Sequence, residues 1–284
     1  MMTDGVRWME AVCQHLPVQG DLLGGLVRIV ERTAEFRALI VSCSLGRGSA
    51  DEFSDVDAAI THTLTEVDRL EVAASDLAGE LGDVVDVHVH GFEGFGDPTR
   101  RVAAVYSNGG QLDLLLIPVA SRSHHLAGEE VVVVDKDGHV SAPFTPPAEA
   151  LAQRTSAQAV EYMHSAWWFL GDVAKYLERR SWYEAVERLG VARDHLLRLV
   201  AIGARTRFPQ YGLVSLVDFA PHAIPARLDV TYPSPRDPES ILSAAVTVAE
   251  LIDDALVDAS RATGKPLASR LAEDVRARLA RVAL

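Results

Sequence analysis

The sequence predicts an α+β region followed by an all-α region, and three features indicate this order. Apolar runs of strand length recur between residues 36 and 138. Prolines at positions 143, 146 and 147 then mark a boundary. From residue 148 onward, apolar residues recur at helical spacing. We therefore expect two domains, 1–142 and 143–284.

The first region combines helices with short strands. Apolar residues recur every three or four positions across 5–35, where Pro17 separates two helices, and a further helix is expected at 64–81. Strands are expected at 36–43, 55–62, 84–90, 101–106, 111–117 and 131–138.

Two of these strand predictions rest on specific patterns. Residues 84–90 alternate strictly, as in a half-buried strand, which puts Asp86, His88 and His90 on one face. The Ser-Asn-Gly-Gly stretch at 107–110 predicts a hairpin turn. A histidine pair without a third ligand is more typical of a surface than of a metal site.

The second region is predicted to consist of helices joined by a long loop. Helices are expected at 148–178 and 181–203, followed by a proline-rich loop over 208–238 and two final helices. Four aromatic residues in these helices are interpreted as interdomain core rather than as a base-stacking platform: Tyr162, Trp167, Trp168 and Trp182.

Composition narrows the class of protein. Of 284 residues, 48% are apolar and 24% are charged, which is typical of a globular protein. The net charge of −13 argues against DNA binding and is compatible with a cationic substrate or with simple solubility. The two cysteines lack disulfide or zinc spacing, and no signal core or membrane-spanning run is apparent. We expect a cytoplasmic protein without a membrane partner, monomeric or homodimeric.

The stretch CSLGRGSADEFSDVD, residues 43–57, carries the strongest chemical signal. Asp55 and Asp57 are two residues apart in an expected strand, so their side chains share a face at about 6.6 Å along the backbone. Two such carboxylates repel each other unless a cation lies between them, and Mg²⁺ prefers these oxygen ligands. An ordinary solvated start of a strand is the alternative.

This spacing resembles the signature of the polymerase-β-like nucleotidyltransferase superfamily, in which a Gly-Ser turn precedes Asp-X-Asp by about ten residues. Only five residues separate Ser49 from Asp55, whereas ten separate Ser44 from Asp55. Ser44 is therefore taken as the signature serine, with Cys43 where the family has glycine. Because a Cβ restricts the backbone near a ligand, we expect weakened binding rather than none. Gly46 and Gly48 are alternative sources of flexibility.

Four further segments resemble streptomycin-type aminoglycoside adenylyltransferases in order and spacing: 102–118, 131–138, 166–179 and 192–199. The resemblance covers roughly residues 35–200. It implies an N-terminal nucleotidyltransferase domain with a mixed β-sheet and flanking helices, followed by an all-α helical-bundle domain.

The resemblance also implies an activity. Such enzymes move a nucleoside monophosphate, here AMP from ATP as co-substrate, to a hydroxyl of a small molecule such as an aminoglycoside-like antibiotic. The transfer is in-line and depends on Mg²⁺. Asp55 and Asp57 are expected to hold the metal, and Asp113 to complete the site as a third metal ligand or as the catalytic base. Asp86 is the rival third carboxylate.

Cationic and polar residues are expected to hold the nucleotide. Ser44 and Arg47 would contact the triphosphate from the turn, and Lys175 from the helical domain. The alternatives are a solvated loop arginine for Arg47 and an exposed helix lysine for Lys175. Arg193 either acts in the same way as Lys175 or pairs with Glu184 or Glu187.

Two other functions remain open. A non-catalytic relative could bind nucleotide or protein, which Cys43 suggests, or the acceptor could be a protein or an RNA. Three retained, mutually repelling carboxylates favour the enzyme. The acceptor is set by loops such as 91–100 and 208–238, which carry no motif that identifies it.

Overall fold

The structure is a computed structural model that describes residues 4–92, 98–121, 128–138, 140 and 148–283. The chain divides into two compact units, Met1–Thr145 and Pro146–Leu284. The predicted fold class is confirmed, since a mixed sheet with flanking helices is followed by a helical region. None of the described helices is both long and apolar enough to cross a membrane.

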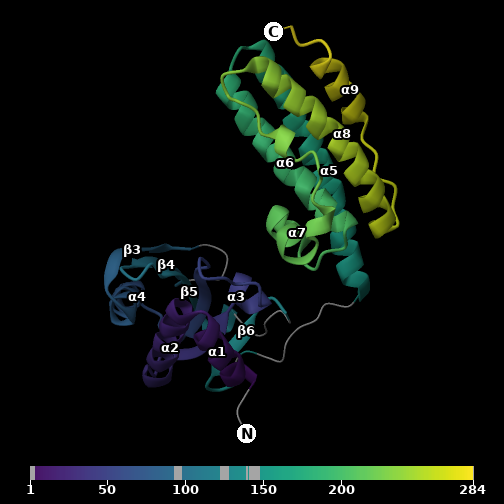
Figure 1. The fold of residues 1–284 in the computed structure, drawn as a ribbon. Coiled ribbons are helices and arrows are strands. Elements are labelled where there is room, and N and C mark those ends of the chain that lie inside the picture. The colour runs from purple at the N-terminus through teal and green to yellow at the C-terminus, as the bar shows by residue number, and fades with distance from the viewer. Residues whose placement is uncertain (1–3, 93–97, 122–127, 139, 141–147, 284) are drawn as a thin grey trace. The chain divides into compact units, whose positions relative to one another are not determined.

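The first unit follows the expected order with two local differences. The signature turn forms a five-residue helix, and the second strand begins one residue later than expected, so Asp55 directly precedes it. The elements are α1 (Asp4–His15), α2 (Pro17–Arg32), β1 (Phe36–Val41), α3 (Cys43–Arg47), β2 (Val56–His62), α4 (Val67–Leu81), β3 (Val84–Gly91), β4 (Arg100–Tyr106), β5 (Gln111–Pro118) and β6 (Val131–Asp135) (Figure 1).

The six strands form one mixed sheet in the order β3-β4-β5-β2-β1-β6. The central pair, β2 and β5, is parallel, and the other neighbouring strands are antiparallel. A parallel pair needs a crossover connection, which α4, β3 and β4 provide between β2 and β5. The ends of β2 and β5 therefore lie side by side in the middle of the sheet.

One face of the sheet packs against α2 and α4. Val56, Ala58 and Ile60 of β2 are buried there, together with Leu112 and Leu114 of β5. Since side chains alternate along a strand, the intervening residues of both strands point to the opposite face. The edge strand β3 is largely exposed rather than half-buried as expected.

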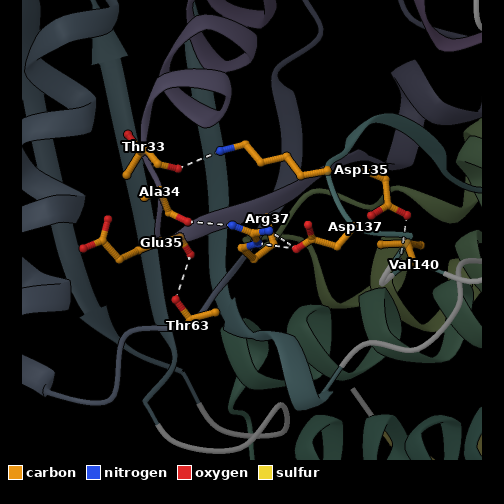
Figure 2. Close-up of polar contacts among 9 residues, drawn as sticks. Thr33, Ala34, Glu35, Arg37, Thr63, Asp135, Asp137 and Val140 are labelled. Atoms are coloured by element: carbon orange, nitrogen blue, oxygen red, sulfur yellow. Dashed lines mark hydrogen bonds and ion pairs between the residues drawn. The ribbon is translucent and has the colours of Figure 1, made fainter.

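The other edge of the sheet is tied to the end of α2 by polar contacts, which Figure 2 shows. Arg37 forms an ion pair with Asp137 and donates to the carbonyl of Ala34 at 2.9 Å. The ammonium of Lys136 donates to the carbonyl of Thr33 at 2.8 Å, near the C-terminus of α2. These contacts fix β6 and β1 to the α2–β1 connection.

The second unit is a bundle in which α5, α6, α8 and α9 pack together around one core (Figure 1). The loop expected at 208–238 contains one short α-helix, α7, and three 3-10 helices of three residues each. The helices are α5 (Ala148–Glu178), α6 (Trp182–Gly203), α7 (Leu213–Phe219), α8 (Pro238–Thr263) and α9 (Arg270–Leu279).

The aromatic residues of this unit do not form a single cluster. Tyr162 and Trp167 are buried in the unit's own core, and Trp182 packs against that core while partly exposed. Trp168, by contrast, is 56% exposed, because it lies on the outer side of α5. The interpretation as interdomain core is therefore wrong for Tyr162, Trp167 and Trp182, which pack within the bundle, and it stays a prediction for Trp168.

Candidate active site

Two of the predicted carboxylates come together at the centre of the sheet. Asp57 of β2 and Asp113 of β5 are direct partners in the parallel pairing, so they share a face on strands about 4.8 Å apart. Asp55 precedes β2 by one residue, and its charge acts on Asp57. The face that carries them is the one opposite the α2 and α4 core.

The environment of Asp57 disfavours its negative charge. Burial, and then the charges of Asp55 and Asp113, raise the pKa of Asp57 from 3.8 to about 6. Within the described residues, no lysine or arginine forms an ion pair with Asp55 or Asp57. Two carboxylates without an ion-pair partner among the described residues are a donor set that fits a hard divalent cation such as Mg²⁺.

Asp113 already has a counter-ion, which the sequence did not reveal. Arg101 of β4 donates through Nε to Oδ1 of Asp113 at 2.7 Å, and a second guanidinium nitrogen contacts Oδ2. Both carboxylate oxygens are thus engaged. In the described part of the chain, no group of three or more His, Cys, Asp or Glu side chains is arranged to hold a metal ion.

The signature turn packs directly against Asp57. Cys43 has a φ of +52°, in the left-handed region that favours glycine, as its assignment to the signature glycine position implies. Burial, and then the nearby negative charge of Asp57, raise the pKa of the Cys43 thiol to about 11. The backbone N–H of Ser42 also donates to the carbonyl of Asp57, at 2.9 Å. Turn and carboxylate are therefore held as one assembly.

Two glycines in the rest of the turn have different structural roles. A Cβ on Gly46 would lie 2.4 Å from the carbonyl oxygen of Glu129, so Gly46 permits close packing of α3 against the segment before β6. Gly48 has a φ of +74° and ends α3. The expectation that both glycines supply flexibility is thus wrong for Gly46. Ser44 and Arg47 lie half-buried on the same short helix, two residues before and one residue after Gly46.

A second turn beside the carboxylates was not foreseen. Gln19 of α2 is only 4% exposed, and its amide donates to the carbonyls of Asp51 at 3.4 Å, Glu52 at 3.2 Å and Ser54 at 2.7 Å. The turn that it holds presents Phe53, which is 85% exposed, two residues before Asp55. No sequence pattern links a helical glutamine to a turn more than thirty residues away.

A family model described as streptomycin adenylyltransferase matches residues 19–282. The chain belongs to the streptomycin adenylyltransferase family. It is therefore a nucleotidyltransferase that uses a nucleotide co-substrate, as the sequence resemblance predicted.

Two solved structures resemble this family member weakly. An aminoglycoside 6-adenyltransferase from Bacillus subtilis is 16% identical, with a TM-score of 0.39, over 93% of this chain and 98% of that chain. A nucleotidyltransferase-like protein from Exiguobacterium sibiricum 255-15 is 12% identical, with a TM-score of 0.37, over 86% and 77% of the two chains. No curated protein matches the sequence. Because both TM-scores are below 0.5, family membership rests on the sequence match.

The rival carboxylate lies away from Asp57 and Asp113. Asp86 is exposed on the edge strand β3, opposite Val105, and β4 separates it from β5. The rings of His88 and His90 stack at a centroid distance of 4.8 Å on the same strand. Asp113, by contrast, is a direct neighbour of Asp57 in the sheet.

The cationic candidates of the second unit have partners of their own. Lys175 Nζ donates to Oδ1 of Asp172 at 2.5 Å. Arg193 donates to the carbonyl of Thr231 at 2.7 Å, and its guanidinium lies 3.6 Å from the centroid of the Tyr232 ring. The expected pairing of Arg193 with Glu184 or Glu187 is therefore wrong.

Proposed function

We propose that this nucleotidyltransferase transfers AMP from ATP to a hydroxyl of a small cationic acceptor of the aminoglycoside class, with Mg²⁺ as cofactor. The observation that carries the proposal is the register of β2 and β5, which sets Asp57 beside Asp113 on the face of the sheet opposite α2 and α4, next to the Cys43–Ser44 turn. Membership of the streptomycin adenylyltransferase family supports the reaction type.

Asp55 and Asp57 hold the metal in this proposal. Bound Mg²⁺ supplies positive charge against the triphosphate, which is the main requirement of phosphoryl-type transfer. The raised pKa of Asp57 supports this role, because it shows that Asp55 repels the negative charge of Asp57. A cation placed between the two carboxylates would relieve that repulsion. Ser44 and Arg47 contact the phosphates from α3 in this proposal.

Asp113 acts on the acceptor side. Its place on β5, one strand from Asp57, suits a group that orients or deprotonates the attacking hydroxyl. The net charge of −13 suits an acceptor that carries amino or guanidino groups, since a negative surface attracts cations. A small hydroxylated cation is therefore favoured over RNA.

Calorimetry of MgATP binding tests the metal site. We expect Asp55→Asn and Asp57→Asn to lose most of the Mg²⁺-dependent part of ATP affinity, because each removes a charged ligand from the pair. Asp86→Asn is the matched control, since it removes the same charge on the edge strand. Undiminished Mg²⁺-dependent affinity in both site variants would contradict the assignment.

Turnover is measured separately as pyrophosphate release with a panel of aminoglycosides and neutral hydroxylated compounds. Release only in the presence of a polycationic acceptor is the expected result. ATP binding that is independent of metal, with no release for any acceptor, would instead indicate a non-catalytic nucleotide-binding relative.

A further inference from the structure

The pair formed by Arg101 and Asp113 has features of a built contact rather than of a chance surface pair. Two nitrogens of the guanidinium engage both oxygens of the carboxylate, with Nε to Oδ1 at 2.7 Å. The two side chains are 39% and 26% exposed. Bidentate arginine–carboxylate pairs of this kind are stronger and more directional than single contacts.

The sheet register sets this contact. Ala103 of β4 lies opposite Asp113 of β5, so Arg101, two residues along β4, lies on the same face and diagonal to Asp113. Arg100 points the other way and pairs with Glu71 at 3.0 Å. Of these two adjacent arginines, only Arg101 faces the proposed metal site.

We propose that Arg101 is a built-in counter-ion of this site, which pairs with Asp113 and competes with a divalent cation for its carboxylate oxygens. The inference rests on the proposed metal site. The guanidinium already binds one lone pair on each Asp113 oxygen and places a positive charge beside them, so a cation that takes Asp113 as a ligand is opposed by this ion pair. Arg101 also lies close enough to Asp57 for their charges to interact.

The consequence is that the metal-free site is not a cluster of three bare carboxylates. Arg101 neutralises Asp113, and the repulsion that remains is concentrated on Asp55 and Asp57. Asp55 and Asp57 therefore form the primary cation site, and Asp113 joins it at the expense of an ion pair.

The experiment is a titration of the full chain with Mn²⁺ in the absence of nucleotide. The concentration of free Mn²⁺ is measured by electron paramagnetic resonance. We expect Arg101→Gln to tighten Mn²⁺ binding by about threefold to tenfold, as expected for loss of a competing, half-exposed ion pair. Arg100→Gln is the matched control, because it removes the same charge from the adjacent residue on the other face. Arg101→Lys should give an intermediate gain, since a lysine keeps the charge without the planar fork.

The Asp113→Asn background separates direct competition from a general charge effect. Adding Arg101→Gln to Asp113→Asn should give no further gain, because the carboxylate for which the two cations compete is absent. An equal gain in both backgrounds would overturn the proposal, as would no gain in Arg101→Gln and Arg101→Lys. If no variant binds Mn²⁺, both the proposed metal site and this inference fail, whereas binding without any gain removes the inference alone.

Discussion

At the scale of single residues, the spacing within residues 43–57 indicated that Cys43 and Asp57 belong to one turn-and-strand signature. Cys43 has the left-handed φ that a glycine would adopt there, at a cost of roughly 1–2 kcal/mol for an L-residue. Its thiol lies near Asp57, whose charge helps to raise the pKa of the thiol, an interaction that glycine cannot have. Spacing could locate these residues because the turn and the strand are adjacent in the chain. It could not reveal Gln19 or Arg101, whose contacts depend on tertiary packing.

The raised pKa of Asp57 gives a testable pH dependence. Because the folded-state value of about 6 exceeds 3.8, the folded protein binds this proton more tightly than the unfolded chain does. The stabilisation by the protonated carboxyl is complete below about pH 4 and is lost as pH rises through about 6. Above pH 6, Asp57→Asn should therefore be more stable than the wild type, by about 1 kcal/mol after allowance for solvent screening.

Urea unfolding of the metal-free wild type and Asp57→Asn between pH 4 and pH 8 measures this difference. Adding Mg²⁺ at pH 7 should stabilise the wild type and leave Asp57→Asn almost unchanged, because bound cation requires the ionised form. Parallel stability curves for the two proteins across this range would show that Asp57 is not perturbed.

At the scale of elements, the register of β4 explains why the site was only partly predictable. If residues 107–110 alone formed the turn, Ala104 would oppose Asp113 and Arg100 would share its face. In the structure Val105 opposes Gln111, so β4 is shifted by one residue and Arg101 takes that face instead. The alternation of apolar residues predicted the strands. It does not fix the register of a hairpin when the sequence leaves the type of turn undetermined. The helix α3 was missed because five residues are too few for a periodic pattern.

The packing of α3 can be tested with Gly46→Ala. The added methyl would meet the backbone of Glu129 at 2.4 Å, so α3 must shift, at an expected cost of about 1–3 kcal/mol. MgATP affinity should also fall, because α3 carries the proposed phosphate contacts. Gly79→Ala in α4 is the matched control: a Cβ there meets no atom within 4 Å, and the change should stabilise by about 0.5–1 kcal/mol.

Thermal unfolding and calorimetry with MgATP measure both effects. Equal stability changes for the two alanine variants would show that α3 can move without cost. A destabilised Gly46→Ala that keeps full MgATP affinity would instead separate the packing of α3 from nucleotide binding.

At the scale of the whole molecule, the sequence predicted the α+β and all-α regions because strand and helix periodicities occupy separate parts of the chain. The structure has a separate hydrophobic core in each unit, built around the sheet in one and around α5, α6 and α8 in the other. The assignment of 1–142 to nucleotidyl transfer and of 143–284 to a helical domain stays a prediction. Composition could not settle it, since acidity and apolar content do not report where substrates bind.

If the two units are thermodynamic domains, a core substitution in one should leave the unfolding of the other unchanged. Leu114→Ala opens the core beneath the sheet and Leu196→Ala opens the core of the bundle, and each should cost about 2–5 kcal/mol because both leucines are fully buried. Three of the four tryptophans, Trp167, Trp168 and Trp182, lie in the second unit, so fluorescence reports mainly on the bundle, whereas circular dichroism follows both units. Leu196→Ala should shift the fluorescence transition in urea. Leu114→Ala should leave that transition unchanged and shift only the part of the dichroism transition that comes from the first unit. A single transition that both variants shift equally by both probes would mean that the chain unfolds as one cooperative body.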